Sequence, residues 1–137
     1  MILVDTGPLV AICDRGEMRH ATAIEVLVRL VTTGLRVCDA VLTEACFHLS
    51  HKVQRERLAL VLDKFAILSL PTHEPAFRQE VFRWLDKYAE HDPDWADGCL
   101  AVWCGRDVRL KVWTYDREFR TTWRKPDGKA IPLTTKA

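Results

Sequence analysis

The sequence lacks the features that mark membrane-spanning proteins and disulfide-bonded secreted domains. No apolar run approaches the ~18–20 residues that a membrane-spanning helix needs. The opening segment has no basic residues before its apolar run and is interrupted by Asp5, so it does not have the pattern of a signal peptide. The five cysteines are odd in number and contain no C-x-x-C pair, which argues against a disulfide framework and a thiolate zinc site. We therefore expect a cytoplasmic protein with reduced cysteines and no membrane association.

The sequence also lacks a strong overall charge. Its formal net charge is +1, so no bulk positive field indicates a nucleic-acid partner. The segment after Asp116 is nevertheless locally basic, a composition that is also common on ordinary solvated surfaces. With 137 residues, 48% of them hydrophobic, the chain suits one domain spanning residues 1–137 with a core of its own.

Short apolar runs alternate with longer helical patterns, which is typical of a parallel sheet covered by helices. We predict a three-layer α/β/α fold with a mainly parallel central sheet of four or five strands. The expected strands are 2–4, 35–38, 66–70, 111–114 and an edge strand at 131–133. The expected helices are 9–13, 19–33, 41–52, 54–65, 77–88, 93–104 and 118–123. For the helix 93–104, the sequence predicts Asp92 as N-cap, Pro93 at the first position and Gly105 at the end.

Five acidic residues fall where an α/β fold brings ligands together. Asp5 and Asp116 follow two predicted strands, and the carboxyl ends of parallel strands share one edge of the sheet. Asp94 and Asp97 are three residues apart, so on a helix their Cβ atoms lie roughly 5–6 Å apart on one face. Glu44 lies near the start of the helix that follows the second strand.

Each acid also has an ordinary structural explanation. Asp5 suits a helix cap, Asp94 is favoured by a helix dipole, Asp116 suits a turn, and Glu44 has His48 one helical turn later. Clustered carboxylates, however, repel one another strongly when they are desolvated. A hard divalent cation such as Mg²⁺ or Mn²⁺ neutralises such a cluster and prefers oxygen ligands. The combination therefore favours a metal site, with one ion or two.

Four short segments, in this order, resemble PIN-domain nucleases, particularly the VapC-like toxins of type II toxin–antitoxin systems. They are V-D-T-G-P-L-V-A at 4–11, T-E-A-C at 43–46, D-W-A-D-G-C-L-A at 94–101 and T-Y-D-R-E-F at 114–119. The resemblance implies catalytic roles for Asp5, Glu44, Asp97 and Asp116, with Asp94 contributing to metal binding beside Asp5, Asp97 and Asp116. It also implies supporting hydroxyls at Thr6 and Thr114. One departure is Gly98, where relatives usually carry alanine.

The expected activity is divalent-metal-dependent hydrolysis of RNA phosphodiester bonds. Arg117 and Arg120 lie beside Asp116 and are candidates for binding the RNA backbone. The resemblance further implies a homodimer and a cognate antitoxin protein as partner.

Three alternatives follow from the same residues. Asp5-Thr6-Gly7 matches the catalytic triplet of aspartic proteases, but their fold is nearly all strand and this chain shows at least four helical patterns. A PIN-like fold can also serve as an RNA- or protein-binding module without cleavage. Finally, the same chemistry suits a nuclease of RNA processing rather than a toxin, or one that cuts structured RNA or DNA.

Overall fold

The central sheet has four strands, all parallel, in the order β3-β2-β1-β4. The structure, a computed structural model, describes residues 1–134. The strands are β1 (Ile2–Val4), β2 (Leu35–Cys38), β3 (Leu68–Leu70) and β4 (Lys111–Trp113). Every residue of β1 is buried, as expected for a central strand covered on both faces.

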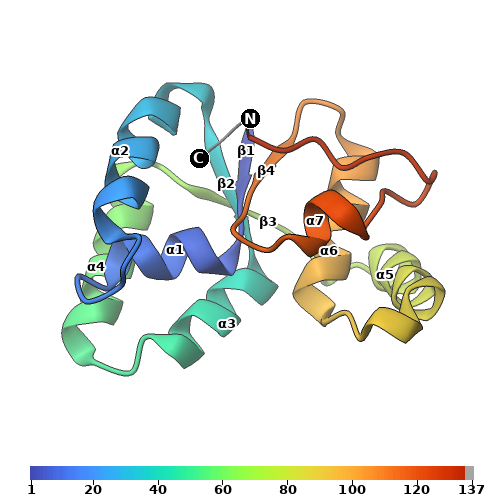
Figure 1. Cartoon of the computed structure of the whole chain (residues 1–137), viewed down its shortest axis with the longest axis horizontal. Helices are drawn as coiled ribbons and strands as arrows, with labels where there is room; N and C mark the ends of the chain where they lie inside the picture. Colours follow the sequence, from blue (N-terminus) through green and yellow to red (C-terminus); the bar gives the residue numbers. More distant parts are fainter. Residues whose placement is uncertain (135–137) are drawn as a thin grey trace.

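Helices cover both faces of this sheet (Figure 1). One layer holds α1 (Thr6–Cys13), α2 (His20–Leu30) with a 3₁₀ turn η1 (Val31–Thr33), α3 (Asp39–His48) and α4 (Lys52–Lys64). The other holds α5 (Pro75–Lys87) with a 3₁₀ turn η2 (Ala89–His91), α6 (Trp95–Arg106) and α7 (Glu118–Thr121). The predicted three-layer α/β/α fold is therefore confirmed, and a nearly all-strand aspartic-protease fold is excluded.

Two predictions are wrong: the edge strand at 131–133 and the N-cap of the helix α6. Residues 131–133 form only one parallel bridge, between Leu133 and Val112, instead of an edge strand. Pro132 has no N–H to extend the ladder, although its carbonyl accepts from Val112 N at 2.8 Å. Asp92 does not cap α6, because its φ of 52° is left-handed whereas an N-cap residue is extended. Asp94 is the cap, and α6 begins one residue later at Trp95.

Other helix and strand ends differ by a few residues. Gly105 lies inside α6, which continues to Arg106. The helix predicted at 41–52 begins earlier, at Asp39, and ends at His48, because a capping box of His51 and Gln54 starts α4 at Lys52. The strand predicted from residue 66 begins at Leu68, since Ala66 has a left-handed φ of 49°. These shifts leave the strand ends that carry Asp5 and Asp116 in place.

The core is continuous on both sides of the sheet and leaves the carboxyl edge of β1 and β4 open for polar residues. Four of the five cysteines are buried, in agreement with the prediction that they serve as small hydrophobic residues, whereas Cys46 is exposed. In the described part of the chain, Asp5 and Thr6 are the buried polar residues, and both lie where β1 meets α1. In the part of the chain that the structure describes, no helix is long and apolar enough to cross a membrane.

Candidate active site

Asp5 lies directly after β1 and caps α1. Its side chain accepts two hydrogen bonds, from Thr6 N to Oδ1 at 2.8 Å and from Thr114 Oγ1 to Oδ2 at 2.7 Å. Only 8% of the residue is exposed, and this burial raises the pKa of Asp5 from 3.8 to about 6. The charges of Glu44 and Asp116 raise it further, whereas the two hydrogen bonds lower it. Asp5 is thus both a helix cap and a desolvated carboxylate.

Glu44 is brought to Asp5 by the packing of α3 against α1. The Thr6 hydroxyl donates to Glu44 Oε2 at 2.9 Å. Because Thr6 directly follows Asp5, this bond holds Glu44 close to Asp5. Glu44 makes no salt bridge with His48 in the described residues, so that structural explanation for Glu44 is not supported. The side chain is half-buried and faces the same cavity as Asp5.

Asp94 and Asp97 form a reciprocal capping box at the start of α6. Asp97 N donates to Asp94 Oδ1 at 2.8 Å, and Asp94 N donates to Asp97 Oδ2 at 3.1 Å. The pKa of Asp97 rises from 3.8 to about 8, mainly through burial and then through the charges of Asp94 and Asp5. The box therefore explains the helix start, but it also holds a second carboxylate where it is costly to ionise.

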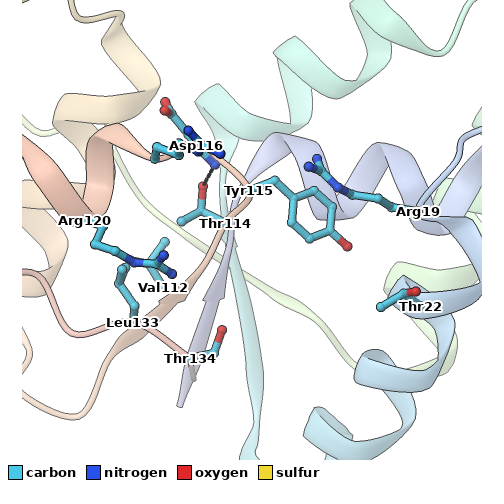
Figure 2. Close-up of a pocket in the computed structure, with 10 residues that line it drawn as sticks. Arg19, Thr22, Val112, Thr114, Tyr115, Asp116, Arg120, Leu133 and Thr134 are labelled. Carbon is cyan, nitrogen blue, oxygen red and sulfur yellow. Dashed lines mark hydrogen bonds between the residues drawn. The ribbon is translucent and has the colours of Figure 1, made fainter. Parts of the chain in front are cut away.

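Asp116 lies in the loop after β4, and Thr114 connects it to Asp5. The Thr114 hydroxyl donates to Asp5. It also accepts from Asp116 N at 2.9 Å, the bond drawn in Figure 2. The Asp116 carboxylate accepts from Glu118 N at 2.9 Å, which is the turn interaction expected for an aspartate at this position. Thr114 thus fixes the separation of the two strand ends that carry acids.

All five predicted acids line one cavity of about 530 Å³. Thr6 also lines it, together with residues that were not predicted to belong to the site: Gly7, Val10, Asp14, Glu17, Arg19, His48 and Tyr115. Asp14 and Glu17 lie in the loop after α1, and no spacing rule connects that loop with the sheet edge. Among the residues that the structure describes, seven carboxylates therefore line this cavity, and Arg19 is the one arginine or lysine beside them.

The side chains are held by hydrogen bonds rather than arranged as a finished coordination shell. Across residues 1–134, no three acidic, histidine or cysteine side chains stand in positions that would already hold a metal ion. Asp5, Glu44, Asp97 and Asp116 each accept from a neighbouring N–H or O–H through one or both carboxylate oxygens. Each carboxylate oxygen has a second lone pair, so these bonds leave acceptor sites facing the cavity.

A second cavity of about 370 Å³ adjoins the first and is basic. Arg117 and Arg120, predicted to bind RNA, both line it. Figure 2 shows Arg19 on the opposite side from Arg120. Its floor is apolar, formed by Val112 and Leu133. Tyr115 and Asp116 line both cavities. The position of Arg19 in this lining could not be predicted, because Arg19 lies in the loop before α2 and not at the end of a strand.

The aromatic residues around the site are mostly structural. Trp84, Trp113 and Trp123 are buried. Trp95 is half-buried between Asp94 and Ala96 and packs on Phe82 at a ring-centroid distance of 5.1 Å.

Comparison with known proteins supports the fold described above. No curated protein matches the chain. Among solved structures, the chain resembles VapC20 of Mycobacterium tuberculosis, described as a toxin that cleaves the sarcin–ricin loop, with a TM-score of 0.69 and 18% sequence identity. The match covers 88% of this chain and 94% of VapC20, and at this identity it supports the fold alone. The family model of the PIN domain matches residues 2–124, which is most of the chain. The chain belongs to the PIN-domain family.

Proposed function

We propose that the protein is a divalent-metal-dependent endoribonuclease, with residues 1–137 acting as one PIN-type nuclease domain. The observation that carries the proposal is the gathering of five carboxylates from four separate segments around one cavity at the carboxyl edge of β1 and β4. Membership of the PIN family and the structural likeness to an RNA-cleaving toxin support it.

The donor set fits Mg²⁺ or Mn²⁺. Every acidic ligand offers oxygen, and hard cations prefer carboxylate oxygen. Burial raises the pKa of Asp5 and Asp97, because a buried carboxylate is costly to ionise. A cation bound beside these residues would stabilise their ionised forms. Asp5, Asp97 and Asp116 would bind the ion directly, with Asp94 beside them. When bound, a divalent ion neutralises phosphodiester charge and lowers the pKa of a coordinated water.

The chain's own residues would prepare the site for this chemistry. Thr114 holds the Asp5 and Asp116 segments in register through its hydroxyl. Thr6 orients Glu44, which we assign a catalytic role as a proton acceptor or a further ligand. Arg117 and Arg120 in the neighbouring basic cavity would hold the RNA backbone against the repulsion of the acids.

The decisive experiment is cleavage of single-stranded RNA with and without EDTA. Wild-type protein should cut RNA in Mg²⁺ or Mn²⁺ and stop when EDTA is added, and Asp5→Asn should be inactive under metal-replete conditions. Wild-type binding of RNA without any cleavage in either metal would support the binding-module alternative instead. Parallel DNA and structured-RNA substrates define the substrate class.

We further propose that the nuclease is the toxin of a toxin–antitoxin pair and acts in the cytoplasm as a homodimer. Expression in cells should arrest growth, and co-expression of a small protein encoded beside it should relieve the arrest. Growth unaffected by an active nuclease would favour a role in RNA processing. Sedimentation analysis of the purified chain would test the homodimer.

A further inference from the structure

The acidic and basic cavities meet at a stacked pair of side chains. The Arg19 guanidinium carbon lies 4.5 Å from the centroid of the Tyr115 ring, a cation–π contact. Both residues line both cavities. Figure 2 shows Arg19 and Tyr115 side by side on one side of the basic cavity, with Arg120 on the other. The pair therefore lies at the boundary that the two cavities share.

The Tyr115 ring is fixed by packing and not by its hydroxyl. A Cβ built on Gly7 would lie 3.2 Å from Tyr115 Cδ2, so the ring packs close to the backbone at the start of α1. The hydroxyl is shielded from solvent and has no hydrogen-bond partner among the described residues. The packing against Gly7 thus sets the position of the Tyr115 ring, and the ring in turn positions the Arg19 guanidinium.

The Arg19 guanidinium keeps its hydrogen-bonding capacity for a ligand. Residue Arg19 is exposed and makes no salt bridge within the described residues, although Glu17 is two residues away. The cation–π contact with Tyr115 forms no hydrogen bond, so the guanidinium N–H donors can bind phosphate oxygens. Among residues 1–134, three arginines and one carboxylate, Asp116, line the basic cavity, whereas seven carboxylates line its neighbour.

We propose that the Arg19–Tyr115 pair is a positioning device that grips a phosphate of single-stranded RNA next to the scissile link, with the basic cavity as the flanking nucleotide subsite. The inference rests on the proposed nuclease function. A phosphate held by Arg19 at the shared rim leaves the following phosphodiester beside the acids, and Arg120 is placed to hold the strand on the far side of the subsite. Arg19 is a positioning residue and takes no part in bond cleavage.

The test is RNA binding measured apart from cleavage. Fluorescence anisotropy of a labelled single-stranded oligoribonucleotide of about ten nucleotides is followed in EDTA, across salt concentrations from about 50 to 200 mM. The proteins are wild type, Arg19→Gln, Arg19→Lys and the matched control Arg29→Gln. Arg29 is exposed on α2, carries the same charge and lines neither cavity.

Affinity falls as salt rises, so the slope of log affinity against log salt is negative. Loss of one phosphate contact should make this slope shallower by about 0.7, equivalent to about fourfold weaker binding at 0.15 M salt. We expect this loss for Arg19→Gln and an unchanged slope for Arg29→Gln. Arg19→Lys should retain the slope, because it keeps the charge, but bind more weakly because it loses the planar stack. Equal slopes for wild type and Arg19→Gln, or equal losses in Arg19→Gln and Arg29→Gln, would overturn the proposal.

The cleavage assay separates this outcome from failure of the proposed function. If the protein cuts no RNA but Arg19→Gln still makes the slope shallower, the subsite stands and the nuclease assignment fails. If the protein cuts RNA in Mg²⁺ and Arg19→Gln leaves both the slope and the KM unchanged, the nuclease assignment stands and the subsite fails. An active enzyme with the subsite should show a higher KM in Arg19→Gln and a nearly unchanged kcat.

Discussion

Replacing Asp5 by asparagine should abolish activity and, without metal, make the folded protein more stable at alkaline pH. The carboxylate is 8% exposed and its pKa is raised from 3.8 to about 6, so ionising it costs the folded state about 3 kcal/mol. The stabilisation conferred by a raised pKa is fully present below pH 3.8 and is lost as the pH rises through about 6. Asparagine carries no charge and avoids this loss.

The size of the effect follows from the same pKa. Between about pH 4 and about pH 8, the unfolding free energy of Asp5→Asn relative to wild type should rise by up to about 3 kcal/mol. For a chain of this length that is roughly 10 °C in Tm. Part of the gain is offset because asparagine has one carboxamide oxygen: if it accepts from Thr6 N, the NH₂ group faces the Thr114 hydroxyl and cannot accept from it.

The assay is thermal or denaturant unfolding in EDTA at both pH values, together with RNA cleavage in Mg²⁺. Cleavage should fall by about a thousandfold or more. Asp86→Asn, the same change on the exposed surface of α5, is the control and should alter neither the pH dependence nor the activity. The reasoning that ionised Asp5 destabilises the fold would be refuted by either of two results. One is a difference in unfolding free energy between Asp5→Asn and wild type that does not change with pH, and the other is an Asp5→Asn variant less stable than wild type at pH 8.

Three further predictions concern metal, the acid on α3 and helix packing. Mg²⁺ should raise the Tm in scanning fluorimetry more at pH 8 than at pH 5, because Asp5 and Asp97 must lose protons to bind it; equal shifts would contradict this. Glu44→Gln should reduce cleavage at least tenfold with a near-normal Tm, and a wild-type rate would remove Glu44 from the site. Gly98→Ala should destabilise by about 1–3 kcal/mol in denaturant unfolding, because its Cβ would lie 2.8 Å from Val81 Cγ1, which outweighs the helix gain of about 0.5–1 kcal/mol. Adding Val81→Ala to Gly98→Ala should restore part of the lost stability. A Gly98→Ala variant more stable than wild type would contradict the prediction, because it would mean that α5 and α6 make room for the methyl group at little cost.

The acids at the sheet edge could be predicted because their positions follow from local patterns. A short apolar strand puts Asp5 at its carboxyl end, and the parallel arrangement then brings Asp116 to the same edge. Helical spacing was enough to pair Asp94 with Asp97, even though the residue that caps the helix was misplaced. The error arose because Asp92 and Asp94 are both good caps, and only the backbone conformation decides between them.

What the sequence did not reveal depends on packing between distant segments. Nothing local indicates that Arg19, in the loop before α2, stacks on Tyr115 after β4. The meaning of Gly98 was likewise hidden, because it lies in the approach of Val81 and Trp84 from α5 and not in helix propensity. Such contacts are set by how the layers pack together, which spacing along one element cannot indicate.

The central claim is that carboxylates far apart in the chain share a divalent ion, and a crystal soaked in Mn²⁺ tests it most directly. Anomalous scattering should show manganese in the acidic cavity in direct contact with Asp5 and with at least one of Asp97 and Asp116. Manganese absent from this cavity, or bound only at its Asp14 and Glu17 rim while Asp5 keeps its present hydrogen bonds, would contradict the account.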